Sequence, residues 1–466
     1  MAQVSFNRVR RHIYTVAFAV MQLIMSQPAS GDLLGHGGMV RAITMSPDGR
    51  YALSGSFDFS AILWNFGEQS ERAVLDGHDA PVNDAAFFGD SERAVTVSDD
   101  GTAIVWSLVE PGTPKIVHRL KGHTHKVMAV AVSLTNDQIA TGGWDKTVRL
   151  WDPVAGLEVR TIETGTPVNA VAFSRDGRWL AIGGHDGRIR LWDRNHDRFG
   201  AVLEGHAMGI TRLAASPTDG RLLSASIDGT VRLWDMDAET QLRVFELHEK
   251  QVFSVSFTPD GQSAVSAGRD GDLIVWALNG TNEPRRIAAH DAIIWSTAVT
   301  PDGRFALSAS SDETVRVWHL DTGDRIGPVE ITSDEPQPWL DSDHPGARLF
   351  TKCVRCHNLS ADGVRRSGPH FEGLFGRVVG RVAGYNYSEV LRRANFQWNA
   401  ETLTALFEKG PDVLLPGTKM PVQRVTDSED LEHLIEFLRI ITNAKKMKKG
   451  LAHENSSVYP SDLHRP

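Results

Sequence analysis

A tryptophan recurs along most of this chain at an almost constant spacing. Gaps of 42, 45, 41, 42, 42 and 42 residues separate Trp64, Trp106, Trp151, Trp192, Trp234, Trp276 and Trp318. A fixed period of this length is typical of repeated units that can bury their apolar faces only against one another. Residues 32–331 of the 466-residue chain are therefore expected to form one repeat architecture, and the rest needs a separate explanation.

Each unit predicts four short strands joined by turns. In the sixth unit, VFSVSF at 252–257 alternates between apolar and polar residues, and Pro259-Asp260-Gly261 predicts a turn. A second strand is expected at 263–267, a third ends in Trp276, and a more variable fourth leads to the next unit.

Within the units, three other residue types keep stricter spacings than the period. An aspartate lies six residues before each tryptophan; in six units a histidine lies 22 residues before that aspartate, and Ser or Thr lies four residues before it. In the fourth unit, Thr164 stands where the other units have histidine, and Ile182 stands where they have Ser or Thr. Histidine and hydroxyl are thus lost together, as expected if these side chains touch each other. A Ser-His-Asp set also occurs in hydrolases, but a catalytic triad needs one copy with an exposed serine, so the recurrence favours a structural network.

These units resemble the WD-repeat β-propeller family. The segments 122–152 and 205–235 match its Gly-His to Trp-Asp pattern closely. The resemblance implies an all-β propeller of seven four-stranded blades, in which Asp, His, Ser/Thr and Trp form a buried hydrogen-bonded tetrad. The last outer strand is expected from 323–331, with 32–34 adding a short piece to the ring closure. The propeller is expected to act as a protein-docking platform.

The N-terminus has the order of residues found in export signals. Three arginines precede the apolar run at 13–25, and Ala29-Ser30-Gly31 offers a small-residue cleavage site. Thirteen helical residues span about 20 Å, less than the roughly 30 Å of a bilayer's hydrocarbon core, which favours a cleaved signal peptide at 1–31 over a retained anchor. The expected location is the periplasm of a bacterium.

Charge is unevenly distributed along the chain. Residues 32–335 carry 28 basic and 43 acidic side chains, a net charge of −15, whereas 336–441 carry 13 of each. No segment is basic enough to predict nucleic-acid binding. An acidic, proline-containing stretch predicts a linker at 332–343, and 442–466 reads as a basic, flexible tail.

The two cysteines of the chain both lie in the pentapeptide CVRCH at 353–357. A zinc site needs about four ligands, and a thioredoxin-like redox pair needs a βαβ context, so neither explains the motif. A covalently attached haem explains all three residues, because Cys353 and Cys356 would form thioethers and His357 would bind iron. Met420, in LLPGTKMP, is the candidate for the second axial ligand, since a thioether sulfur suits haem iron.

Residues 344–441 resemble a class I, mitochondrial-type cytochrome c. The matching stretches are GARLFTKCVRCH, SGPHFEGLFGR, AGYNYS, the lone Trp398 and PGTKM. The resemblance implies an all-α domain with one covalent haem c and axial ligands His357 and Met420. It also implies further haem-site residues, namely Pro369 accepting from His357, Arg377, Tyr387 and Trp398 at a propionate, and Thr418 and Lys419 beside the methionine loop.

The resemblance also predicts helix packing, and it has two departures. Gly346 and Phe350 are expected to cross the last helix at Leu434 and Phe437, and Thr426-x-x-Glu429 predicts a capping box at that helix's start. Leu391 and Leu406 stand where the family usually has asparagine and tyrosine, so the distal haem pocket should be less polar.

The predicted function is single-electron transfer by an exported monohaem cytochrome that is not itself an enzyme. Its propeller would dock a redox protein, and a membrane-associated respiratory complex is a candidate for that partner. Two alternatives are a redox enzyme subunit whose propeller holds a substrate or second cofactor, and a haem-based sensor or interaction protein.

Overall fold

The computed structural model describes residues 32–109, 112–135, 138–280, 283–326, 342–350, 353–354, 357–361, 368–383, 385, 387–416, 418, 420 and 424–442. The predicted signal peptide at 1–31 and the predicted tail beyond Thr442 lie outside these residues, as does nearly all of the predicted linker. Among the described residues, no helix combines the length and the apolar character needed to cross a bilayer.

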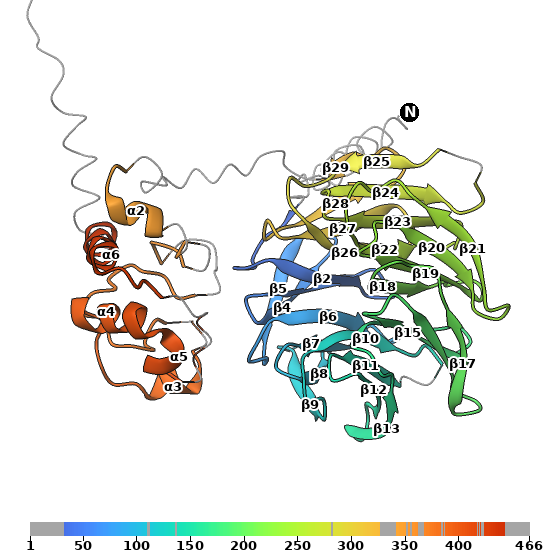
Figure 1. The fold of residues 1–466 in the computed structure, drawn as a ribbon, viewed down its shortest axis with the longest axis horizontal. Coiled ribbons are helices and arrows are strands. Elements are labelled where there is room, and N and C mark those ends of the chain that lie inside the picture. The colour runs from blue at the N-terminus through green and yellow to red at the C-terminus, as the bar shows by residue number, and fades with distance from the viewer. Residues whose placement is uncertain are drawn as a thin grey trace, which may run out of the picture.

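Seven antiparallel sheets follow one another along residues 32–326 and form a β-propeller (Figure 1). The prediction of seven blades is thus confirmed. The first three blades contain β2 (Val40–Met45), β3 (Tyr51–Ser56), β4 (Ser60–Asn65), β5 (Ser70–Asp76); β6 (Val82–Phe87), β7 (Arg93–Ser98), β8 (Thr102–Ser107), β9 (Lys115–Lys121); and β10 (Val127–Val132), β11 (Ile139–Gly143), β12 (Thr147–Asp152), β13 (Leu157–Glu163).

The remaining blades follow the same order from the inner strand outwards. They contain β14 (Val168–Phe173), β15 (Trp179–Gly184), β16 (Ile189–Asp193), β17 (Arg198–Leu203); β18 (Ile210–Ala215), β19 (Arg221–Ser226), β20 (Val231–Asp235), β21 (Thr240–Phe245); β22 (Val252–Phe257), β23 (Ser263–Gly268), β24 (Asp272–Ala277), β25 (Arg285–Ala288); and β26 (Ile294–Val299), β27 (Phe305–Ser310), β28 (Val315–His319).

The apolar core of the propeller lies between neighbouring blades. The regular spacing of the tryptophans places each one in a buried cluster with residues of the preceding blade: Trp106 shares its cluster with Leu53 and Leu63 of blade one, and Trp276 with Leu223 of blade five. Trp64 packs with Val317 of blade seven, so the same contact also joins the last blade to the first. A blade therefore completes its core only when its neighbours are present.

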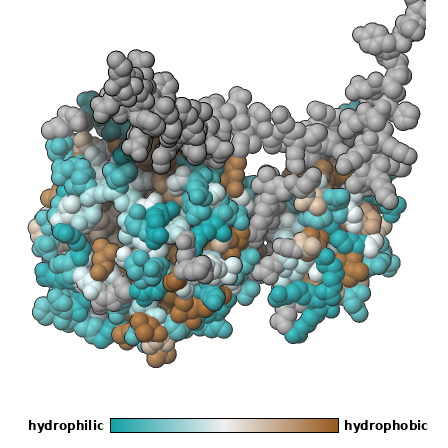
Figure 2. Space-filling model, turned by 180° about the vertical axis from the view of Figure 1, so that it is seen from behind, coloured by the Kyte–Doolittle hydropathy of each residue, from teal (hydrophilic) through white to brown (hydrophobic). Residues whose placement is uncertain are grey.

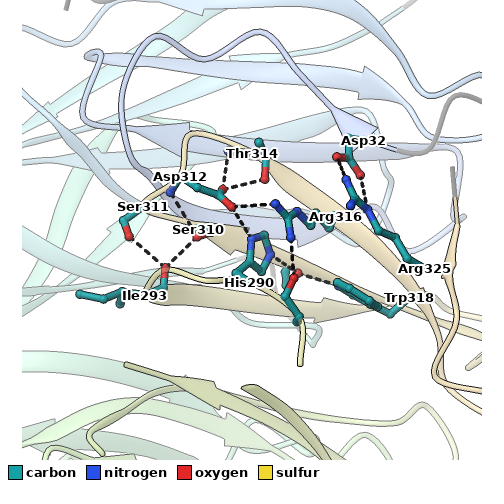
Figure 3. Close-up of polar contacts among 12 residues, drawn as sticks. Asp32, His290, Ile293, Ser310, Ser311, Asp312, Thr314, Arg316, Trp318 and Arg325 are labelled. Carbon is teal, nitrogen blue, oxygen red and sulfur yellow. Dashed lines mark hydrogen bonds and ion pairs between the residues drawn. The ribbon is translucent and has the colours of Figure 1, made fainter. Parts of the chain in front are cut away.

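Both ends of the repeat region close the ring. β1 (Asp32–Leu33) and β29 (Arg325–Ile326) each pair with β28, so two short segments together form the outer strand of blade seven. Arg325 Nε lies 3.2 Å from Asp32 Oδ1, which ties one segment to the other (Figure 3). The predicted strand at 323–331 is present at 325–326, and its residues after 326 lie outside the described chain.

The helical part contains α2 (Pro345–Phe350), α3 (Glu389–Arg393), α4 (Ala400–Lys409), α5 (Pro411–Leu414) and α6 (Ser428–Ile441). The predicted crossing of the first and last helices is confirmed. A Cβ on Gly346 would lie only 2.2 Å from His433 O, and the rings of Phe350 and Phe437 are 5.6 Å apart. Buried residues of α2, α4 and α6 form one apolar core.

The start of α6 differs from the prediction. Asp427 is its N-cap, and the Asp427 carboxylate accepts from the backbone N–H groups of Glu429 and Asp430 at 3.0 and 2.9 Å. The predicted Thr426–Glu429 capping box is therefore wrong, because the carboxylate one residue later is a better acceptor for these N–H groups and carries a charge that favours the helix N-terminus.

The coloured part of the face seen in Figure 2 is mainly hydrophilic, with apolar residues in separate spots. Several exposed apolar side chains lie on the outer strands β9 and β13, including Ile116, Val117, Leu157 and Val159.

Candidate functional site

The predicted hydrogen-bonded tetrad is present in six of the seven blades. In blade one, Trp64 Nε1 donates to Ser54 Oγ at 2.8 Å, Ser54 lies 2.7 Å from His36 Nε2, and His36 Nδ1 lies 2.8 Å from Asp58 Oδ2. An indole only donates and a carboxylate only accepts, so with neutral His36 the donors run from Trp64 through Ser54 and His36 to Asp58. The corresponding sets begin at His78, His123, His206, His248 and His290 (Figure 3 shows the last).

The tetrads are structural, because their serine hydroxyls cannot reach a substrate. Ser54, Ser224, Ser266 and Ser308 have no exposed surface. Burial raises the pKa of Asp58, but His36, the Ser60 hydroxyl and the Gly37 N–H together hold that pKa at about 2. The carboxylate therefore remains charged at neutral pH and accepts from all three groups. This geometry excludes a hydrolytic triad at these residues.

Blade four replaces the tetrad with other contacts. The Thr164 hydroxyl lies 2.8 Å from the carbonyl oxygens of Lys146 and Thr166, and Ile182 is fully buried where other blades have Ser or Thr. Asp186 is bound instead by Arg190, whose Nη2 lies 2.7 Å from Oδ2. Blade four therefore lacks both members of the contact between histidine and hydroxyl, as expected if the two are lost together.

A cavity of about 550 Å³ lies at the helical part of the chain. Eight of the ten predicted site residues line this one cavity: Cys353, His357, Pro369, Arg377, Tyr387, Trp398, Thr418 and Met420. The other two, Cys356 and Lys419, lie outside the described residues. Residues separated by 67 positions, from Cys353 to Met420, therefore face one space.

His357 is oriented by its neighbours in the cavity. Its Nδ1 lies 2.7 Å from the Pro369 carbonyl oxygen, so Nδ1–H donates there and the Nε2 lone pair remains available. Burial lowers the pKa of His357 to about 4, although the Pro369 contact opposes this shift. Its ring stacks on Phe371 at 4.4 Å, and a Cβ on Gly368 would lie 2.3 Å from the imidazole. A neutral imidazole held in this way can bind a metal.

Met420 lies on the loop before α6, within reach of the same core. Its backbone N–H donates to Thr418 Oγ1 at 3.2 Å, and its side chain packs against the buried cluster of the helical part. Leu391 and Leu406 also line the cavity, and Leu406 is buried. The cavity wall is therefore apolar at both positions where the resemblance predicts a polar side chain.

Arg377, Tyr387 and Trp398 bring polar groups into an otherwise apolar cavity. Arg377 Nη1 and Nη2 donate to the carbonyl oxygens of Glu372 and His370 at 3.0 and 2.9 Å, which fixes the guanidinium. Burial raises the pKa of Tyr387, whose hydroxyl accepts from the Val382 N–H at 3.4 Å. A partly buried arginine beside a phenol and an indole is a suitable site for a carboxylate.

The residues present fit a covalently attached haem. The cavity offers a thiol at Cys353, an imidazole and a thioether, apolar walls, and an arginine for a carboxylate. Thioether and imidazole are the donors typical of haem iron in electron carriers. Among the described residues, no three His, Cys, Asp or Glu side chains gather into another kind of metal site.

Sequence reasoning missed one wall of this cavity. The propeller contributes Met39, Phe57 and Phe59, together with Gly37, Gly38, Ser311 and Glu313. One signal was available, since Phe59 follows the tetrad aspartate at a position where four other units have glycine.

Comparison with known proteins matches both parts of the chain. The family model described as "WD domain, G-beta repeat" matches residues 29–65, 69–107, 114–152, 156–193, 198–235, 239–277 and 282–319. Cytochrome c of Cochliobolus lunatus is 42% identical over 94 residues, which are 20% of this chain and 86% of that protein. Cytochrome c of Arabidopsis thaliana is 40% identical over 94 residues, 20% of this chain and 83% of the relative. Cytochrome c2 of Rhodoplanes tepidamans is 34% identical over 93 residues, 20% of this chain and 86% of the relative.

The fold and the site together define the class of protein, which is a repeat propeller joined to a segment similar to small haem proteins. The chain belongs to the WD-repeat family through its blades, and to the cytochrome c family through about a fifth of its length.

Proposed function

We propose that this protein is an electron carrier with one covalently bound haem c. The cytochrome-like segment is residues 344–441, Cys353 and Cys356 hold the haem, and His357 and Met420 are its axial ligands. The observation that carries the proposal is that His357 and Met420 line one and the same cavity. The similarity to cytochromes c supports it.

The haem, when bound, supplies an iron that changes reversibly between the ferrous and ferric states. The chain's own residues hold it and set its surroundings. Pro369 fixes the His357 ring through the 2.7 Å contact to Nδ1. Leu391 and Leu406 would help to exclude water from the cavity, and Arg377, Tyr387 and Trp398 would bind a propionate. No bond of a substrate is formed or broken, so the protein is a carrier rather than an enzyme.

The propeller is proposed to dock a redox protein, within or outside a membrane-associated respiratory complex. Its 28 basic and 43 acidic side chains in residues 32–335 favour a basic partner surface, because complementary charge accelerates encounter. The N-terminal arginines and apolar run support export to the periplasm of a bacterium, where c-type haem would be attached. A nucleic-acid partner is not proposed.

The first test is the spectrum of the purified holoprotein and of Met420→Ala. The wild type should show a low-spin haem and, when oxidised, a sulfur-to-iron charge-transfer band. Met420→Ala should lose that band, whereas Met208→Ala, at a propeller residue that is 55% exposed, should retain it. A holoprotein without covalent haem, or an unchanged band in Met420→Ala, would contradict the proposal.

A haem-based sensor is a second candidate, favoured by the apolar side chains of Leu391 and Leu406 in the cavity. Because these two side chains offer no hydrogen bond to the methionine sulfur, Met420 should dissociate from the haem iron more readily. Carbon monoxide binding to the reduced protein at neutral pH, without denaturant, would favour the sensor over the carrier.

A further inference from the structure

The haem-type cavity has a wall that belongs to the propeller. The loops after β1 and after β3 in blade one contribute Gly38, Met39, Phe57 and Phe59 to its lining. Phe57 and Phe59 are both partly buried. Blade one of the propeller and the helical part, which lie more than 250 residues apart in the chain, therefore line the same cavity.

The loop that carries the two phenylalanines is firmly held. Asp58, between them, accepts from His36 Nδ1 at 2.8 Å and from the Gly37 N–H at 2.9 Å. The Phe57 N–H donates to the Met39 carbonyl at 3.0 Å. The tetrad of blade one therefore fixes the backbone on both sides of Asp58 and, with it, the position of the aromatic pair.

Phe59 occupies a backbone conformation that is unfavourable for an aromatic residue. Its φ is +70°, and the corresponding residues Gly101, Gly187, Gly229 and Gly271 have φ between +78° and +86°. A bulky side chain at positive φ is uncommon. Lys146 and Glu313 hold the same position in two other blades at φ +67° and +72°, so the turn accepts a side chain there, and what distinguishes Phe59 is an aromatic ring at the cavity wall.

Phe57 has a second support from the propeller interior. The Arg41 guanidinium lies 5.7 Å from the Phe57 ring and 4.9 Å from the Trp295 ring. Arg41 is the extra residue of a bulge between β2 and β3, a feature that redirects a side chain. The Arg41 guanidinium thus lies near both Trp295 of blade seven and Phe57, and it links the blade-one loop to the last blade of the ring.

We propose that the blade-one loop, residues 57–59, is an intramolecular docking surface that covers the open side of the haem cavity in the same chain. This inference rests on the proposed function for the identity of the cofactor, but the contact itself does not depend on it. Phe57 and Phe59 exclude water and small solutes from this side of the haem. A redox partner must then approach the haem elsewhere, or compete with the propeller for this side.

Photo-cross-linking tests the contact directly. In the full-length holoprotein, Phe59 is replaced by photoreactive p-benzoyl-phenylalanine, and the same residue is placed at Ile227, the equivalent of Phe57 in blade five. We expect the Phe59 probe to give an adduct within one chain, mapped by peptide mass to residues 368–391 or 415–420, and the Ile227 probe to give none there. An adduct between chains, or no adduct to the helical part, overturns the proposal.

Haem accessibility provides an independent readout. Phe57→Ser combined with Phe59→Gly should raise the rate of haem oxidation by ferricyanide severalfold, whereas Ile227→Ser should leave it unchanged. Glycine accepts the positive φ of position 59, so the double variant should keep its fold, checked by an unchanged thermal transition. An unchanged oxidation rate in a folded double variant contradicts the proposal. A wild-type protein without a covalent haem spectrum would contradict the proposed function instead.

Discussion

Ser224 illustrates how much a single buried hydroxyl can contribute. It accepts from Trp234 Nε1 at 2.8 Å and lies 2.7 Å from His206 Nε2, and it has no exposed surface. Removing the hydroxyl leaves a buried donor and a buried ring nitrogen without a partner. Unsatisfied buried polar groups are costly because water cannot reach them.

Ser224→Ala should therefore lower the free energy of unfolding by about 1–3 kcal/mol. Urea denaturation followed by tryptophan fluorescence measures the change. Ser70→Ala is the matched control, because the Ser70 hydroxyl makes its contact with Glu68 at the surface. Equal stability of the two variants would mean that the tetrad contributes little beyond its packing.

The residue scale also shows where sequence reasoning succeeds and where it stops. The 22-residue and four-residue spacings predicted which His, Ser and Asp meet, because a strand register converts fixed spacing into fixed contact. The same spacing argument could not place Phe59 beside the haem-type cavity, since most other residues that line this cavity come from 353–438, a segment outside the repeats. Asp427 was missed because Thr426, one residue earlier, fits the same capping pattern.

At the scale of elements, the crossing of α2 and α6 depends on a glycine, Gly346, which has no side chain at the point of closest approach. A Cβ on Gly346 would lie 2.2 Å from His433 O and 2.8 Å from Phe437 Cβ. Alanine normally favours a helix over glycine by up to about 1 kcal/mol, so propensity and packing oppose each other here. Packing should prevail, because the closest atoms belong to the α6 backbone and cannot move without moving the helix.

Gly346→Ala should therefore destabilise the helical part despite its better helix propensity. The transition is followed by loss of the methionine–iron charge-transfer band on heating, which should occur at a lower temperature than in the wild type. Arg348→Ala is the control from the same helix, since the Arg348 side chain is 82% exposed. A raised transition temperature for Gly346→Ala would show that the two helices separate easily.

At the scale of the whole molecule, the tetrads make the propeller sensitive to acid. Burial raises the pKa of Asp312, yet His290, Thr314 and Arg316 hold it at about 2, and Asp58 has the same value. The ordinary value for this carboxyl is 3.8, so the folded state binds the proton less readily than the unfolded state does. Such a group stabilises the fold above its unfolded pKa, and this contribution is lost as the pH falls through its folded pKa.

The urea midpoint of the propeller should therefore be constant above about pH 5 and fall steeply between about pH 4 and pH 2. Asp312→Asn should have a lower midpoint at neutral pH and a shallower fall in acid, because it lacks one of these carboxylates. Asp291→Asn, an exposed position in the loop before β26, should follow the wild-type curve. A wild-type midpoint that rises on acidification would contradict the assignment of charged tetrads.

The ring closure on β28 determines when the propeller can finish folding. Leu33 pairs with Val315, and Trp64 packs with Val317, so the first residues of the ring bind partners synthesised about 250–280 residues later. Contacts this distant in sequence form slowly, because a long chain segment must be ordered before they contribute. Until blade seven exists, blade one has an uncovered apolar face, and β1 has no strand to pair with. A chain interrupted before blade seven should therefore be prone to aggregation, and the ring should become resistant to proteolysis in one late step rather than blade by blade.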